Sequence, residues 1–150
     1  MDKVKQVIVF RKDLKLSKGQ IVVQGAHASI AFLTNLVRAY PDDIIPFYKC
    51  EEQWINGTFY KVCLAAKDEK ELLDIGHQAV AIGLKVYYIQ ENDLFDEPTI
   101  TCIAIGPNYS SIIDPVTKHL KLLWNTELGT KSTIVGMNLQ LLVIQMKTLK

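Results

Sequence analysis

The sequence predicts an α/β fold in which a four-stranded mixed β-sheet carries helices on both faces. A β-branched run at Val7–Val9 suits a strand that is buried on both faces. Apolar residues then recur at helical spacing from Val23 to Val37. Segments of these two kinds follow each other in the order β-α-β-α-β-β-α, and strands separated by helices are typical of a mixed α/β sheet.

The first strand is expected at Val4–Arg11. A helix should begin after Ser17, because Ser17 and Gln20 have the spacing of a capping box. Residues 41–58 are rich in loop-forming types, with a short helix expected at Glu51–Ile55.

The same alternation continues after this loop. Asp68 is the expected N-cap of a second long helix, which should end near Gly83. An acidic loop at 90–98 separates the last two strands. The remaining elements are expected at Phe59–Ala66 (strand), Lys85–Ile89 (strand), Thr101–Gly106 (strand) and a final short helix up to about Lys118, capped by Ser110 or Ser111.

Length and composition describe one folded domain. The chain has 150 residues, 49% apolar and 22% charged, which excludes global disorder. Three scattered cysteines argue against a disulfide framework or a structural zinc site. The N-terminus lacks the pattern of a secretory signal, and the longest apolar stretch, Leu141–Ile144, is too short to cross a bilayer. A cytoplasmic protein that does not enter a membrane is therefore expected.

Charge is unevenly distributed along the chain. Residues 1–39 carry seven basic and two acidic side chains (net +5), residues 40–98 five and twelve (−7), and residues 99–150 five and two (+3). If the two positive segments converge in space, they form a basic face for a partner that bears phosphate. Ordinary solvated side chains explain the same pattern.

Lys18 is the first candidate functional residue. It falls at the first helical position, where a cation opposes the helix dipole but helps the free backbone N–H groups to hold an anion. Gly19 would allow a ligand to approach the backbone closely. The alternative is a solvated lysine at a helix end.

Two further regions could carry chemistry. His27 lies in the segment Gln24–Ser29, whose small residues allow close packing, and a packing role for this histidine is the alternative. The acidic loop has four carboxylates within Glu91–Glu97, any of which could act as a general base or simply be solvated. Thr101 begins the next strand. Zinc-protease, P-loop and dinucleotide-binding patterns do not occur in the sequence.

Together these motifs resemble the type 2 peptidyl-tRNA hydrolases over about residues 3–124. The resemblance rests on several separate segments in the right order. These are Lys5–Val9 with Arg11–Gly19, Gln24–Ser29 (the family's Gln-x-x-His-Ala), Lys61–Val62, Glu71–Leu73, Ala104–Pro107, and Ile113–Asp114 with Val116–Thr117 and His119–Leu123.

The resemblance implies hydrolysis of the ester that links a peptide to the terminal ribose of tRNA, without metal or cofactor. It implies a four-stranded mixed sheet and, because such proteins are often dimeric, a homodimer. Lys18 and Thr101 match functional positions of the family and are expected to be catalytic together with Glu91. The residues expected to bind substrate are Lys15, Gly19, Gln24 and His27.

The loop after the third strand departs from the family pattern. The family carries Asp-Ala-Gly-x-Thr, whereas this chain has Glu91–Phe95 (Glu-Asn-Asp-Leu-Phe) in a loop that is two or three residues shorter. Glu91 would replace the aspartate, and either Phe95 or Asp93 would replace the threonine. An enzyme with a rebuilt loop and an inactive homologue that binds RNA or a protein are both compatible with this change, and hydrolysis of another acyl ester or amide is a third hypothesis.

Residues 125–150 extend beyond the region of resemblance. Their apolar residues fit a helical stripe (Ile134, Met137, Leu141, Ile144) or an alternating strand face (Met137, Leu139, Leu141, Val143) equally well. We expect this extension to pack on the domain of residues 1–124 or on a partner subunit.

Overall fold

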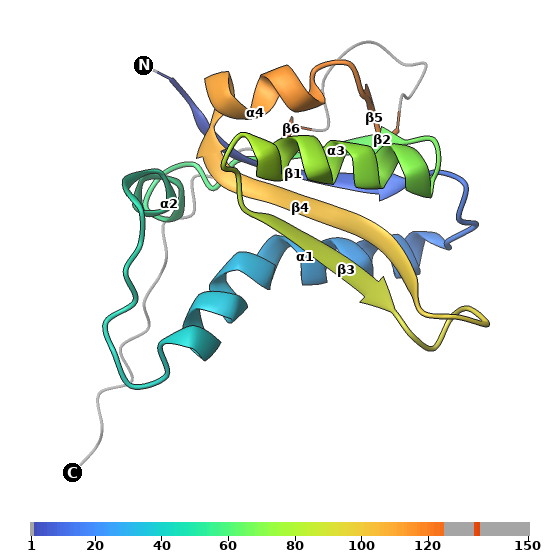
Figure 1. Ribbon diagram of the computed structural model, residues 1–150, viewed down its shortest axis with the longest axis horizontal. Coiled ribbons are helices and arrows are strands. Elements are labelled where there is room, and N and C mark those ends of the chain that lie inside the picture. The colour runs from blue at the N-terminus through green and yellow to red at the C-terminus, as the bar shows by residue number, and fades with distance from the viewer. Residues whose placement is uncertain (1, 125–133, 136–150) are drawn as a thin grey trace.

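The computed structural model describes residues 2–124 and 134–135. Its elements follow the predicted alternation of strands and helices (Figure 1). In chain order they are β1 (Val4–Arg11), α1 (Lys18–Ala39), α2 (Lys49–Ile55), β2 (Lys61–Ala66), α3 (Glu69–Ala81), β3 (Val86–Glu91), β4 (Thr99–Tyr109), α4 (Ser110–Thr117), β5 (Lys121–Leu122) and β6 (Ile134–Val135).

The sheet is mixed, as predicted, but it holds more than four strands. Its order is β3-β4-β1-β2-β5, with β6 also paired to β2. Among the strands that the structure describes, β1 and β2 run parallel and the other pairs are antiparallel. The prediction of four strands was wrong because β5 and β6 have two residues each. A segment this short shows no periodicity in the sequence.

Helices cover both faces of the sheet, which confirms that part of the prediction (Figure 1). Alternate residues of β1 divide the core between the two faces. Val7 and Val9 pack with α3 and α4 residues on one side. Ile8 and Phe10 pack on the other side, with Ala28 of α1.

The two long helices begin where their sequence signals placed them. The Ser17 backbone N–H donates to Gln20 Oε1 (2.7 Å), and the Gln20 N–H donates to Ser17 Oγ (3.3 Å), which completes the capping box. In α3, Asp68 Oδ1 accepts from the Glu71 N–H at 2.9 Å. Helix α1 therefore starts at Lys18, the position that the sequence predicted.

The start of α4 differs from the prediction. Neither Ser110 nor Ser111 is its N-cap, which is Tyr109, without a side-chain cap bond. Instead the carboxylate of Asp2 accepts hydrogen bonds from the Ser111 N–H (3.3 Å) and from the Ser111 hydroxyl. The cap thus comes from the other end of the chain, which no local motif reveals.

Helix α1 has one packed face and one exposed apolar face. Gln24, Ala28, Ala31 and Phe32 are buried against the domain. Within the described residues this is the one helix whose length and composition match a membrane-crossing segment, although only 22% of the matching window is buried. The exposed apolar side chains of this helix are Val22, Val23, Ile30 and Val37.

Candidate functional site

A chain of hydrogen-bonded side chains joins α1, β3 and β4. The Thr101 hydroxyl donates to Gln24 Oε1 at 2.7 Å, and Gln24 Nε2 donates to Glu91 Oε2 at 2.7 Å. Thr101 and Gln24 are buried, whereas Glu91 is half-exposed at the end of β3. The side chain of Gln24 therefore connects a fully buried hydroxyl to a carboxylate that solvent can reach.

The backbone after β3 holds the second oxygen of Glu91. Glu91 Oε1 accepts from the N–H groups of Asp93 (3.0 Å) and Asn92 (2.9 Å). These bonds, first that from Asp93, lower the pKa of Glu91, and the bond from Gln24 and the nearby His27 act in the same direction. Glu91 is therefore ionised and fixed in orientation at neutral pH.

A β-bulge places Thr101 in this chain. Ile89 pairs with Cys102 and the next residue, Gln90, pairs with Ile100, so Thr101 is an extra residue of β4. As a result Thr101 and Cys102 both reach Gln24, the first with its side chain and the second by a weak Sγ contact to the Gln24 carbonyl at 3.7 Å. Regular alternation would have turned one of them to the opposite face.

Burial makes Cys102 a poor nucleophile. Its side chain is fully buried, and burial raises the pKa of this thiol to about 12. The reactive thiolate is therefore almost absent at neutral pH, and Cys102 serves as packing beneath the site.

Three of the predicted site residues are exposed at the start of α1: Lys15 lies in the loop before the helix, and Lys18 and Gly19 are its first two residues. Arg11 anchors that loop through two bonds to Asp13, Nε to Oδ1 at 3.1 Å and Nη2 to Oδ2 at 2.7 Å, which lower the pKa of Asp13. The first turn of α1 contains no acidic residue. No carboxylate of this turn therefore neutralises its N–H groups or the ammonium groups of Lys15 and Lys18.

Lys18 and the polar chain are separate parts of the site. Gln24 lies six residues after Lys18, about 9 Å along the axis of α1. In the part of the chain that the structure describes, Lys18 makes no ion pair or side-chain hydrogen bond with Glu91. The structure therefore brings together Gln24, Glu91 and Thr101, and leaves Lys15, Lys18 and Gly19 at the adjacent helix end.

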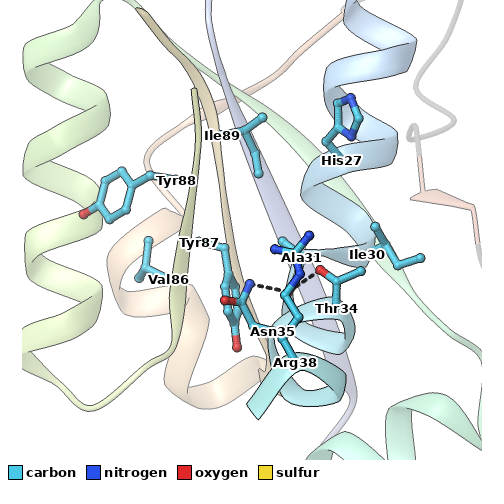
Figure 2. A pocket seen from close by; sticks show the side chains of 10 residues that line it. All are labelled: His27, Ile30, Ala31, Thr34, Asn35, Arg38, Val86, Tyr87, Tyr88 and Ile89. Carbon is cyan, nitrogen blue, oxygen red and sulfur yellow. Dashed lines mark hydrogen bonds between the residues drawn. The ribbon is translucent and has the colours of Figure 1, made fainter. Parts of the chain in front are cut away.

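His27 is exposed and lies one turn after Gln24 on α1. It borders a groove of about 530 Å³ between α1 and strand β3 (Figure 2). Sequence reasoning missed this groove, because it depends on the approach of a helix to a strand about 50 residues later in the chain. The groove is lined by His27, Ile30, Ala31, Thr34, Asn35, Arg38, Val86, Tyr87, Tyr88 and Ile89.

The remaining acidic side chains of the loop after β3 take no part in the hydrogen bonds between Thr101, Gln24 and Glu91. Asp93, Asp96 and Glu97 are exposed, and of the loop's carboxylates only Glu91 bonds to Gln24. The groups of histidine, cysteine and carboxylate residues in the described ranges include no arrangement of three or more that could hold a metal ion.

Among the described residues, one lysine of the first positive segment and one of the last lie at the same end of the sheet. Lys121 of β5 pairs beside Ala65, and the Lys12 N–H bonds to the carbonyl of Ala66, so both lysines lie at one end of the sheet. Lys12, Lys15, Lys18 and Lys121 are exposed.

The fold and the site define an α/β protein with a hydrogen-bonded Thr–Gln–Glu chain beside a lysine-bearing helix start. Residues 4–123 match the family model described as peptidyl-tRNA hydrolase PTH2. The chain belongs to this family, which confirms the resemblance seen in its sequence motifs.

Curated relatives show the same relationship. The peptidyl-tRNA hydrolase of Thermococcus onnurineus is 37% identical over 125 residues, covering 82% of this chain and 100% of the relative. That of Methanopyrus kandleri is 41% identical over 122 residues, with 79% and 97% covered. The probable peptidyl-tRNA hydrolase 2 of Dictyostelium discoideum is 33% identical over 120 residues, with 79% and 54% covered.

Proposed function

We propose that this protein hydrolyses the ester bond of peptidyl-tRNA or N-acyl-aminoacyl-tRNA, releasing free tRNA and peptide. Membership of the PTH2 family supports the reaction. The observation that assigns the reaction to particular residues is the pair of hydrogen bonds that joins Thr101, Gln24 and Glu91. These bonds orient an ionised carboxylate at the protein surface.

In this proposal Glu91 is the general base. It takes a proton from the attacking water, whose oxygen bonds to the carbonyl carbon of the ester. The bond from that carbon to the terminal ribose oxygen then breaks, and the ribose oxygen receives the proton to give the free hydroxyl of tRNA. Because its pKa is lowered, Glu91 is available in the ionised form at neutral pH but is a weak base. Its fixed orientation offsets part of that weakness, since a water held at hydrogen-bonding distance is positioned for attack.

Gln24 and Thr101 act on Glu91 and not on the substrate. The Thr101 hydroxyl is fully buried, so a substrate cannot contact it without a rearrangement. By donating to Gln24 Oε1 it fixes which end of the amide faces Glu91. We therefore propose Thr101 as a positioning residue, a narrower role than the catalytic one expected from the sequence.

The lysines at the start of α1 are proposed to hold the tRNA. Lys18, with the backbone N–H groups of the first helical turn that the Ser17 cap does not occupy, suits a phosphate. Lys15 adds charge, and the exposed Gly19 allows close approach of the ligand to the backbone. His27, at the other side of Gln24, is proposed to contact the acyl part of the substrate.

The alternative is an inactive homologue that binds RNA or a protein partner. The low pKa of Glu91 favours it, because a carboxylate that accepts three hydrogen bonds is a poor proton acceptor. The two candidates differ in one measurement, the release of the acyl group from N-acetyl-aminoacyl-tRNA.

The test compares the wild-type protein with Glu91→Gln and with Asp93→Asn as the control. We expect wild-type release of the acyl group and a loss on the order of 100- to 10,000-fold in Glu91→Gln, with tRNA binding retained. No release by the wild-type protein above the buffer rate supports the inactive homologue. Full activity in Glu91→Gln with loss in Asp93→Asn assigns the base to Asp93.

We further propose a cytoplasmic protein whose partner is tRNA, without metal, cofactor or membrane association. The exposed apolar face of α1 (Val22, Val23, Ile30, Val37) supports a homodimer, because an uncovered face of this kind is a common contact surface. Residues 125–133 and 136–150 lie outside the described residues, and their packing on the domain or on a partner stays a prediction. Sedimentation of the full chain tests the dimer, and a monomeric mass at micromolar concentration contradicts it.

A further inference from the structure

The groove between α1 and β3 is lined partly by main chain. Four consecutive residues of β3, Val86–Ile89, border it. Two of these side chains point to the opposite face of the sheet: Val86 packs in the core with α3, and Tyr88 lies against Gly76 of α3 (Figure 2). These two residues therefore meet the groove through their backbone.

The hydrogen-bond pattern of β3 leads to the same conclusion. The Lys85 carbonyl accepts from the Gly106 N–H of β4, and the Ile89 carbonyl also faces β4, where the Thr101 hydroxyl lies 3.3 Å away. In an antiparallel pair the backbone groups of alternate residues face the partner strand. Those of Val86 and Tyr88 thus point away from β4, and β3 is an edge strand within the described residues.

The groove also continues from the catalytic chain. Ile89 and His27 border its near end, two and three residues from Glu91 and Gln24. Arg38 borders its far end. Eleven residues of helix separate His27 from Arg38, about 17 Å at 1.5 Å per residue, which is the length of about five residues of extended chain.

We propose that this groove binds the peptide part of the substrate as an extended strand added to the edge of β3. The proposal rests on the proposed function and specifies which part of peptidyl-tRNA lies where. Outward N–H and C=O groups of an edge strand bind any peptide sequence, because they contact only its main chain. Recognition of this kind depends on the length of the bound peptide and not on its sequence.

The charges of the residues that line the groove favour a peptide over RNA as its occupant. Among the residues that line the groove only Arg38 carries a permanent positive charge, whereas RNA-binding grooves are strongly basic. The lysines lie instead at Lys15 and Lys18, at the start of α1. Along the helix the order is therefore lysines, Gln24, then groove, which matches the order of tRNA, ester and peptide in the substrate.

The proposal predicts that kcat/KM rises with peptide length. Full-length protein is assayed on one tRNA carrying the same esterified residue, extended to N-acetylated chains of one, two and four residues. One or two added main-chain hydrogen bonds correspond to an increase of about tenfold from one to four residues.

Two matched pairs of variants test the groove through the ratio of kcat/KM for the four-residue and one-residue chains. Val86→Pro removes the outward N–H and is expected to lower this ratio to about threefold or less, while Val86→Ala, which keeps the N–H, retains it. Thr34→Trp fills the groove and is expected to act like Val86→Pro, while Thr34→Ala retains the wild-type ratio. Circular dichroism of each variant confirms folding.

Each other outcome overturns a defined part of the argument. A ratio near one in the wild-type protein, with measurable hydrolysis, refutes the peptide groove and leaves the hydrolase intact. An unchanged ratio in Val86→Pro and Thr34→Trp, with both rates reduced, assigns the groove to RNA. An unchanged ratio with a changed sedimentation mass assigns it to a second copy of the chain. Absence of hydrolysis for every substrate refutes the proposed function itself.

Discussion

Replacing Gln24 by leucine tests whether catalysis requires the orientation that Gln24 gives to the carboxylate of Glu91. Leucine has a similar volume but can neither accept from Thr101 nor donate to Glu91. Both bonds are 2.7 Å long, and Gln24 is 2% exposed, so water cannot replace the acceptor that the buried Thr101 loses. The substitution therefore isolates the two hydrogen bonds with little change in packing.

The magnitude follows from what each partner retains. Thr101 keeps a weaker acceptor, the Ile89 carbonyl at 3.3 Å, so the free energy of unfolding should fall by only about 1–2 kcal/mol. Glu91 keeps two backbone donors but loses the bond that fixes Oε2. A misplaced base reduces the rate on the order of 10- to 100-fold, and we expect a loss of this size in kcat.

The pH profile of kcat/KM tests directly whether the bond from Gln24 acts on Glu91. The bond from Gln24 lowers the pKa of Glu91, so activity that needs the ionised form persists to acidic pH in the wild-type protein. Without this bond the pKa of Glu91 rises only part of the way towards its usual value, because the backbone bonds from Asp93 and Asn92 remain, and the acidic limb of kcat/KM should move slightly to higher pH. Acyl release from N-acetyl-aminoacyl-tRNA is measured from about pH 3 to pH 8, because an ordinary glutamate titrates near about pH 4.3 and the limb of the wild-type protein lies below that value.

Gln78→Leu is the matched control, because Gln78 is an exposed residue of α3 far from the site in the fold. It should change neither kcat nor the limb. If Gln24→Leu keeps the wild-type rate and profile, the hydrogen-bonded chain is a packing feature and Glu91 is not oriented by it.

Three further predictions concern binding and stability. Lys18→Ala should weaken tRNA binding and reduce the slope of log affinity against log salt by about one, measured by filter binding at several salt concentrations; an unchanged slope places Lys18 outside the phosphate site. Lys85→Met should lower the free energy of unfolding by about 2–3 kcal/mol in urea titrations, because it leaves the buried carboxylate of Glu51 without its 2.7 Å partner, and equal stability would mean that Glu51 finds another donor. Truncation after Trp124 should lower the melting temperature or change the sedimentation mass, because the apolar residues removed contribute about 25 cal/mol per Å² that they bury, and identical values would exclude a packing role for the extension.

Local signals in the sequence predicted most of the fold. The run Val7–Val9 identified the central strand, and the pair Ser17 and Gln20 identified the first residue of α1. Both depend on residues close in sequence. The family motifs added the function, because several of them recur in the right order.

Features that depend on distant residues were not predictable in this way. Thr101 and Gln24 are 77 positions apart, and Gln24 and Glu91 are 67 apart. Gln24 was expected to contact substrate, but it is buried between Thr101 and Glu91. The bulge in β4 turns the side chain of Thr101 inwards, towards Gln24. A bulge changes the register of a strand pair without changing the composition of either strand, so periodicity does not reveal it.

The position of β1 in the middle of the sheet has a consequence for synthesis of the protein. This strand is made first, yet its parallel partner β2 begins more than 50 residues later, and Val4 pairs with Tyr109 of β4. A nascent chain that ends before β4 exposes an apolar strand with one open edge, the kind of surface that pairs with other chains. Tyr109 is residue 109 of 150, so about three quarters of the protein must be synthesised before β4 can pair with β1 along its whole length, and contacts this distant in sequence favour slow folding.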